Sequence, residues 1–314
     1  MSARQSDRLA AAGHAWEQRR GVREGTATIM KEKKIYSTWF AVPALVIYGV
    51  FFLVPILISF VFSLMNWTFQ GMSWAGLKNY FTFFSDYSMT IGIKNTLIYA
   101  FATCIAKVVL GFLLAVFLTS KIRTKNLIRS IVFFPNIVST IAVGITFSAL
   151  MHPTKGLINK ALALIGIHGP DWLGNIHLAL GSVIFTDIWK GVGVATVIYI
   201  AGITSIDRSF YEAASLDGAN GMQKLLNITL PLVRPSMNSV IILALTSGMR
   251  CFDLIWTMTG GGPGFVTDVM ASIVYKKYAA GYYGLSTAGN VIMFVMIAVI
   301  AIPLQRFLQS REEV

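Results

Sequence analysis

Residues 211–235 read YEAASLDGANGMQKLLNITLPLVRP and lie between two of the most apolar parts of the chain. The stretch carries charges, amides and glycines together with Pro231 and Pro235. Charged side chains and unsatisfied backbone groups are costly in hydrocarbon, so this segment is not expected to cross a bilayer. We therefore interpret it as an organised polar loop between two membrane spans.

The rest of the chain has the composition of an all-α membrane protein. Of its 314 residues, 55% are hydrophobic and only 13% are charged, whereas a soluble domain is about 25% charged. Several apolar runs approach or exceed about 20 residues, the length of a helix that crosses a bilayer. Six spans are predicted, at about 37–65, 95–119, 128–150, 178–203, 236–259 and 288–309.

These runs divide the chain into a polar tail, residues 1–36, and a transmembrane domain, residues 37–314. The loop between the fourth and fifth spans covers residues 204–235. Most Lys and Arg residues outside the runs fall on the side that holds this loop and the tail. Besides the basic residues of the tail, these are Lys121, Arg123, Lys125, Arg129, Arg208, Lys224, Arg234, Arg306 and Arg311. The opposite side holds Lys78, Lys94, Lys155, Lys160, Lys276 and Lys277.

Because positively charged loops remain inside, both termini are predicted to be cytoplasmic in a bacterial inner membrane, surrounded by lipid. The same topology accounts for the net charge of +12, and no nucleic-acid partner is expected. Cys104 and Cys251 lie within apolar runs, and the four histidines lack the spacing of metal ligands. No metal site is therefore expected.

Two short helices are predicted in the loop. Ser209 and Glu212 have the spacing of a capping box, which would start a helix near Phe210. Gly218 suits a left-handed helix end, and residues 221–228 would form a second helix stopped by Pro231 and Pro235. An ordinary connecting loop with some helical content is the alternative.

The loop resembles the cytoplasmic signature of permease subunits in binding-protein-dependent ABC importers. The resemblance rests on Glu212-Ala213-Ala214, Asp217-Gly218-Ala219 and Ile228-Thr229-Leu230-Pro231 at the family spacing, and on Thr259–Pro263 after the fifth span. It covers roughly residues 37–309 and is similar to the sugar branch, of the maltose and glycerol-phosphate type. The resemblance implies a six-transmembrane-helix importer fold with a coupling helix.

In such importers the coupling helix sits in a cleft of a separate ATP-hydrolysing subunit. The resemblance assigns this contact to Glu212, Ala213, Ala214, Asp217 and Gly218. It also implies a second related permease, an ATPase dimer that binds ATP and Mg²⁺, and a periplasmic solute-binding protein. The chain itself has no G-x-x-x-x-G-K-[ST] motif, and GGGPG at 260–264 is interpreted as an external turn. No catalytic residue and no cofactor of its own are therefore expected.

Charged residues are predicted to form a layer near the middle of the membrane. Counted along straight helices, Asp187 and Arg250 would lie about 14 Å deep and Lys107 about 18 Å deep, with Lys190 and Asp253 nearby. Such groups normally face a bundle interior or a wet pathway. The structural alternative is two ion pairs, Asp187 with Lys190 and Arg250 with Asp253.

By resemblance to maltose-type permeases, the substrate pathway includes positions on the two spans that flank the loop. These are Asp187, Lys190, Gly191, Val194, Ala244, Gly248 and Cys251, to which the charge pattern adds Arg250 and Asp253. Three bases against two acids leave a surplus positive charge, which favours carboxylate recognition.

The predicted cargo is therefore an acidic oligosaccharide such as an oligouronide, as in alginate importers. A neutral sugar or glycerol phosphate is the alternative. An ion-coupled secondary transporter and a structural subunit of another membrane complex are weaker alternatives, because neither requires the loop signature.

Overall fold

The computed structural model describes residues 38–120 and 122–310 of the chain. The predicted tail, Lys121 and Arg311 lie outside the described residues. The chain divides into two compact units between Leu57 and Ile58. The described part of the first unit is helical throughout and comprises η1 (Thr38–Ala41), α2 (Val42–Tyr48), η2 (Gly49–Leu53) and the start of α3 (Val54–Ser63).

The second unit begins within α3 and contains one short hairpin, β1 (Met65–Thr68) and β2 (Gly71–Trp74), paired antiparallel. Its other elements are helices, in the order α4 (Lys78–Ser85), α5 (Tyr87–Thr119), α6 (Lys125–Ile137), α7 (Thr140–Leu150), α8 (Leu157–Leu164), α9 (Ala179–Thr204), α10 (Arg208–Leu216), α11 (Gly221–Lys224), η3 (Leu225–Thr229), α12 (Leu230–Leu232), α13 (Arg234–Met249), α14 (Asp253–Met258), α15 (Met270–Ala279) and α16 (Tyr283–Gln309).

Four helical segments of the described chain are long and apolar enough to cross a membrane: Trp39–Ser63, Tyr87–Thr119, Ala179–Thr204 and Tyr283–Gln309. Two further spans arise if each of two bent helix pairs counts as one, which brings the number to six. The first, second, fourth and sixth predicted spans therefore correspond to continuous helical segments. The second and sixth helices start earlier than predicted, at Tyr87 and Tyr283.

The third and fifth predicted spans are wrong as straight helices. Residues 128–150 bend by 99° between α6 and α7. The fifth span ends at Met249, and three non-helical residues separate it from the short helix α14. Hydropathy averages over a window and so cannot detect a break inside an apolar run.

Two prolines are absorbed by local widening of a helix. The wider turns η2 and η3 each end two residues before a proline, Pro55 and Pro231 respectively. Proline has no N–H for the usual helical bond, and a wide turn redistributes the neighbouring carbonyls. The prediction that Pro231 stops a helix was therefore wrong, because the chain continues through α12 into α13.

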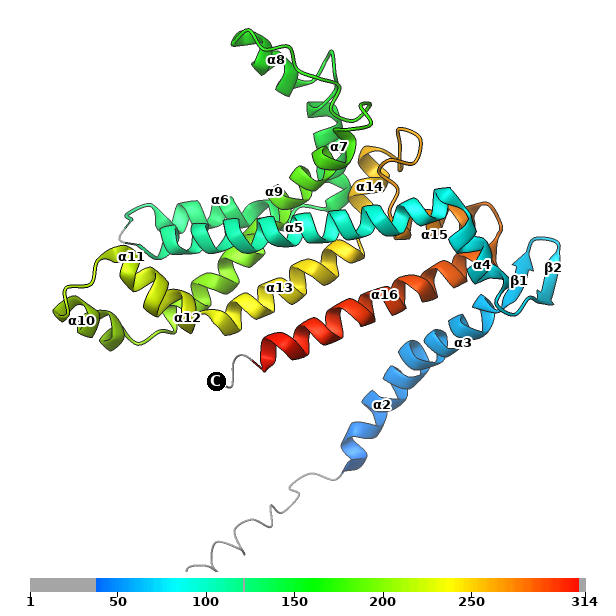
Figure 1. Ribbon diagram of the computed structural model, residues 1–314, viewed down its shortest axis with the longest axis horizontal. Helices are drawn as coiled ribbons and strands as arrows, with labels where there is room; N and C mark the ends of the chain where they lie inside the picture. The colour runs from blue at the N-terminus through cyan, green and yellow to red at the C-terminus, as the bar shows by residue number, and fades with distance from the viewer. Residues whose placement is uncertain (1–37, 121, 311–314) are drawn as a thin grey trace, which may run out of the picture. The chain divides into compact units, whose positions relative to one another are not determined.

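Helix α5 is the central support of the second unit. It packs along both α9 and α13 (Figure 1), and α9 also packs against α6. Small residues permit these close approaches: a Cβ at Gly111 of α5 would lie 2.7 Å from the Cβ of Ala195 on α9. Small-residue contacts of this kind are the usual means by which membrane helices approach closely. The packing of these helices places Lys107 of α5, Asp187 of α9 and Ser247 of α13 around one cavity.

Candidate functional site: a charged cavity and a polar loop

Lys107 and Asp187 form an ion pair between α5 and α9. The Nζ of Lys107 lies 2.7 Å from Oδ2 of Asp187, and the two side chains are only 7% and 18% exposed. A buried charge is tolerated when it is paired and hydrogen-bonded. The first acid of the predicted charged layer is therefore neutralised by a base from another helix.

Gly191 provides the space through which Lys107 reaches this partner. A Cβ at position 191 would lie 2.6 Å from Cε and 2.8 Å from Nζ of Lys107. These distances are shorter than van der Waals contact, so any larger residue at position 191 would displace the ammonium group. Gly191 follows Asp187 by one helical turn and thus lies beside the ion pair.

The other two bases of the layer contact backbone oxygens. Nζ of Lys190 donates to the carbonyl of Asn136 at 3.4 Å, and Nε of Arg250 donates to the carbonyl of Thr246 at 3.3 Å. Asn136 lies in the last turn of α6, where carbonyls lack a helical partner. Among the residues that the structure describes, neither Asp187–Lys190 nor Arg250–Asp253 is an ion pair. The structural alternative of two ion pairs is therefore wrong.

Arg250 and Asp253 also differ from their expected setting. Arg250 caps α13 and Asp253 begins α14, so the two residues flank a break and do not share a helix face. The depth counted for Arg250 along a straight helix does not apply. Arg250 and Asp253, on either side of the break, nevertheless line the same cavity.

A cavity of about 220 Å³ collects most of the predicted pathway residues. It is lined by Lys107, Asn136, Thr140, Asp187, Lys190, Gly191, Ser247, Arg250, Cys251, Phe252, Asp253 and Leu254. A second cavity of about 240 Å³ shares Lys107, Asn136, Gly191 and Ser247 with it and adds Val194 and Ala244. Gly248 lies elsewhere, because it is buried against Ala100 of α5, whose Cα would be 2.8 Å from a Cβ at position 248.

Four further lining residues, Thr140, Ser247, Phe252 and Leu254, were not predicted from the sequence. Thr140 starts the second half of a bent helix, and Phe252 and Leu254 flank the break before α14. These three residues reach the cavity because the helices bend or break beside them, which the sequence does not reveal. Ser247 precedes Arg250 by three residues near the end of α13, and its polarity within an apolar run was the available signal.

Residues 208–232 fold into short helices separated by a glycine turn. The first, α10, starts at Arg208, and the carboxylate of Asp207 accepts the N–H of Ser209 at 2.9 Å. The predicted capping box of Ser209 and Glu212 was therefore wrong, because Asp207 takes the capping role. The turn at Gly218 is confirmed, with φ of +77°.

The Asp207 cap also lowers the pKa of that carboxyl, first through the hydrogen bond from the Ser209 backbone. A lowered pKa means that the cap contributes to stability above the unfolded-state value of about 3.9. The contribution is lost as the pH falls through the lowered pKa. The cap is thus fully present at neutral pH.

The second helix of the loop begins with a capping box of a different composition. The side chain of Asn220 accepts the N–H of Gln223, and the Gln223 side chain accepts the N–H of Asn220. The hydroxyls of Tyr211 and Thr229 lie 2.9 Å apart and join the two helical segments. The loop is thereby held as a unit that presents Glu212, Ala213 and Gly218 at its surface.

Exposed apolar residues accompany these polar positions on the loop. Leu216 is 90% exposed, and Phe210 and Met222 are also exposed. Apolar surface is therefore exposed on an otherwise polar segment. The exposure of these three side chains was not predicted from the sequence, since an apolar side chain at helical spacing is usually buried.

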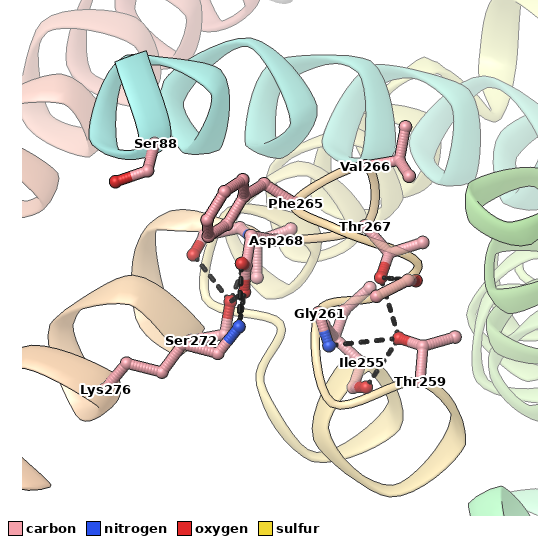
Figure 2. A network of polar contacts seen from close by, with 12 residues as sticks. Ser88, Ile255, Thr259, Gly261, Phe265, Val266, Thr267, Asp268, Ser272 and Lys276 are labelled. Atoms are coloured by element: carbon pink, nitrogen blue, oxygen red, sulfur yellow. Dashed lines mark hydrogen bonds and ion pairs between the residues drawn. The ribbon is translucent and has the colours of Figure 1, made fainter. Parts of the chain in front are cut away.

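The glycine-rich stretch 260–264 lies in a turn between α14 and α15, as predicted. The hydroxyls of Thr259 and Thr267 lie 2.7 Å apart across the turn, and the hydroxyl of Thr267 donates to the carbonyl of Gly262 (Figure 2). The side-chain amide of Asn95 on α5 donates to the carbonyls of Val266 and Asp268, each at 2.9 Å. The turn is thus fixed to the central helix.

The same turn ends at an ion pair whose acid is buried and whose base is partly exposed. The Asp268 side chain is 1% exposed, and both of its oxygens accept hydrogen bonds from Nζ of Lys276, at 2.8 and 2.7 Å. The hydroxyl of Ser272 donates to Oδ1 of Asp268 as well (Figure 2). This network fixes the start of α15 and was not anticipated from the sequence.

Comparison with known proteins identifies the family. The chain matches the sequence profile of the "Binding-protein-dependent transport system inner membrane component" over residues 107–314. The chain belongs to this family. The matched region contains the charged cavity, the polar loop and the glycine turn, so all three are features of an inner-membrane transport component.

Two relatives of this chain have names that refer to sugars. The chain is 30% identical over 257 residues to the trehalose/maltose transport system permease protein MalF of Thermococcus litoralis, covering 81% of this chain and 87% of the relative. It is 31% identical over 291 residues to the multiple sugar-binding transport system permease protein MsmF of Streptococcus mutans, covering 91% of this chain and 100% of the relative.

Its fold is also that of a solved importer. A crystal structure of a bacterial ABC transporter involved in the import of the acidic polysaccharide alginate matches with a TM-score of 0.78 and 21% sequence identity. The match covers 95% of this chain and 99% of the matched chain. The transport component therefore has the fold of an ABC importer permease.

Proposed function

We propose that the chain is the permease subunit of an ATP-driven importer that carries an acidic oligosaccharide across the bacterial inner membrane. The observation that carries the proposal is the unequal pairing of charges in the cavity. Lys107 neutralises Asp187, whereas Lys190 and Arg250 hydrogen-bond to backbone carbonyls and form no ion pair among the described residues. With Asp253 as the one remaining acid of the lining, the cavity keeps a surplus positive charge. Ammonium and guanidinium groups whose charge is not neutralised by an acidic partner suit the carboxylates of a uronate.

The sugar class draws support from the names of the two relatives, a trehalose/maltose and a multiple sugar-binding transport system permease. The acidic character rests on the cavity and agrees with the alginate importer whose fold the chain shares. A neutral sugar, as for the maltose permease, is the competing substrate. The two differ in whether removing the positive charges abolishes transport.

Transport would proceed by alternating access. Ligand pockets usually measure about 300–1,000 Å³, whereas the charged cavity measures about 220 Å³. A bound sugar therefore requires the bundle to open.

We propose that a periplasmic binding protein delivers the sugar, that a second related permease completes the pathway, and that an ATPase dimer supplies the movement. Both termini would lie in the cytoplasm, as the distribution of basic residues predicts.

The loop of α10 and α11 would couple the permease to the ATPase through Glu212, Ala213, Ala214, Asp217 and Gly218. We add Leu216, because an apolar side chain that is 90% exposed fits a buried contact with a partner. Small residues beside it allow close packing against a cleft. The chain itself would bind neither ATP nor Mg²⁺.

The cargo is tested with the double variant Lys190→Ala plus Arg250→Ala. The complete importer is reconstituted in proteoliposomes, and uptake of a uronate trisaccharide is compared with uptake of its carboxyl-reduced, neutral form. We expect uronate uptake to fall by at least about 100-fold, because each hydrogen bond to a charged group contributes about 1.5–3 kcal/mol. Lys94→Ala, at an exposed position of α5, serves as the control. Equal uronate uptake by wild type and double variant would refute the acidic cargo.

If the loop couples the permease to the ATPase, a change at Leu216 should weaken binding of the ATPase without destabilising the permease. Leu216→Asp should leave the thermal unfolding of the isolated permease unchanged, because surface substitutions usually cost within about 0.5 kcal/mol. Its affinity for the ATPase should fall by at least about 30-fold, the effect of losing one central contact residue. Copurification and surface plasmon resonance measure this. Leu164→Asp, at a position that is 89% exposed on α8, is the matched control. Equal affinities of the two variants would exclude Leu216 from the interface.

A further inference from the structure

The ion pair of Lys107 and Asp187 also bears on which substrate charge the cavity accepts, and this inference rests on the proposed acidic cargo. We infer that this ion pair sets the charge selectivity of the cavity: Lys107 cancels Asp187, so that Lys190 and Arg250, opposed by Asp253 alone among the charged lining residues, leave the cavity positive and determine which substrates enter. Lys107 is thus a specificity-determining residue on α5, outside the two spans that flank the coupling loop. Gly191 is the positioning residue that keeps Lys107 in place.

The geometry supports this assignment over a purely structural ion pair. Lys107 lines both cavities, and Asp187 lines the charged one. Asp187 is 18% exposed at its side chain, so its carboxylate remains within electrostatic reach of a substrate in that cavity. In the weakly screened interior an uncompensated carboxylate repels another carboxylate strongly. Among the described residues, Lys107 is the base that pairs directly with Asp187 and so reduces that repulsion.

The setting of Gly191 is the second, independent observation. A methyl group at this position would collide with the end of the Lys107 side chain at 2.6–2.8 Å, and with no other residue among its three nearest atoms. The end of a lysine is flexible, so the collision is relieved by moving the ammonium group and not the backbone. Gly191→Ala therefore displaces Lys107 from Asp187 while the formal charge of the chain stays the same.

These relations predict opposite effects on binding of an acidic sugar. Lys107→Met exposes the negative charge of Asp187 to the cavity and should weaken uronate binding by at least about tenfold. Asp187→Asn frees the charge of Lys107 and should strengthen it by a similar factor. A pair that only holds α5 against α9 would instead weaken binding in both variants, because either change breaks the same contact.

The experiment measures equilibrium binding to the complete importer in nanodiscs. The probes are a fluorescent uronate trisaccharide and its carboxyl-reduced form, and their ratio of dissociation constants is the readout. We expect this selectivity ratio to fall in Lys107→Met and in Gly191→Ala, to rise in Asp187→Asn, and to return toward wild type in Lys107→Met plus Asp187→Asn. The ratio is insensitive to a uniform loss of folded protein.

The two proposals fail in different ways. If wild type prefers the uronate but Lys107→Met and Asp187→Asn shift the ratio in the same direction, the selectivity role of the pair is wrong and the acidic cargo stands. If wild type binds both sugars equally and Lys190→Ala plus Arg250→Ala changes nothing, the acidic cargo is wrong and the role of the pair falls with it.

Discussion

Lys276→Met is expected to lower the free energy of unfolding by about 3–5 kcal/mol, the effect of leaving a buried charge without its partner. The Asp268 side chain is 1% exposed, and each of its two carboxylate oxygens accepts a hydrogen bond from Nζ of Lys276. Without Lys276, the hydroxyl of Ser272 remains as a donor, but no positive charge balances the carboxylate. The N-terminus of α15 and the turn before it should loosen together.

Lys277→Met provides a control at the next position of the same helix. Nζ of Lys277 lies 3.7 Å from Oδ2 of Asp86, and the side chains are 27% and 38% exposed. An exposed pair of this kind contributes no more than about 1 kcal/mol. Thermal unfolding in detergent measures both variants, and Lys276→Met should lower Tm by at least about 6 °C, given roughly 2–4 °C per kcal/mol for a domain of this size.

Neutralising the acid provides the decisive check of this prediction. Asp268→Asn combined with Lys276→Met removes the uncompensated charge, and most of the lost Tm should return. Equal destabilisation by Lys276→Met and Lys277→Met would show that burial of Asp268 does not govern the stability of this region.

Gly193→Val should disrupt the crossing of α6 and α9. A Cβ at position 193 would collide with the backbone carbonyl of Val132 and approach the Cα of Phe133 to 3.0 Å. Backbone atoms of a packed helix cannot rotate away, so the helices must separate. We expect the free energy of unfolding to fall by about 3 kcal/mol or more, the upper end of the range typical of overpacking. Uptake should also be lost, because α6 supplies Asn136 to the cavity.

Gly181→Val is the matched control on the same helix. No atom lies within 4 Å of a Cβ at position 181, so both variants carry the same change of side chain and only one meets a neighbour. The difference in Tm between them therefore isolates the contact with α6. Identical Tm values and identical uptake would show that α6 and α9 do not approach closely in the membrane.

The sequence supported the major divisions of the fold because their cause is local. Long apolar runs must form helices in lipid, where every backbone group needs an internal partner, and α5, α9 and α16 follow the predicted runs. Gly218 was also predictable, since a left-handed backbone position favours glycine. The helix start at Arg208 was missed because Asp207 and Ser209 both offer suitable capping oxygens, and the chain uses the first.

The charged cavity was only partly predictable. Spacing along one helix grouped Asp187, Lys190 and Gly191 correctly on neighbouring turns of α9. The structural alternative paired Asp187 with Lys190, whereas the structure pairs it with Lys107, which is 80 residues away in the sequence. Which base reaches which acid depends on where α5 crosses α9, and the absence of a side chain at Gly191 creates the passage.

By itself, the sequence determined that the long apolar runs form helices, that the polar segment after the fourth run turns at Gly218, and that charges lie in apolar runs. Those properties follow from hydropathy and local backbone preferences. Only the tertiary structure decided that Arg250 ends a helix, that Asn136 and Thr140 border the cavity, and that Lys107 neutralises Asp187. Each of these depends on breaks and helix crossings, which arise from packing between segments far apart in the chain.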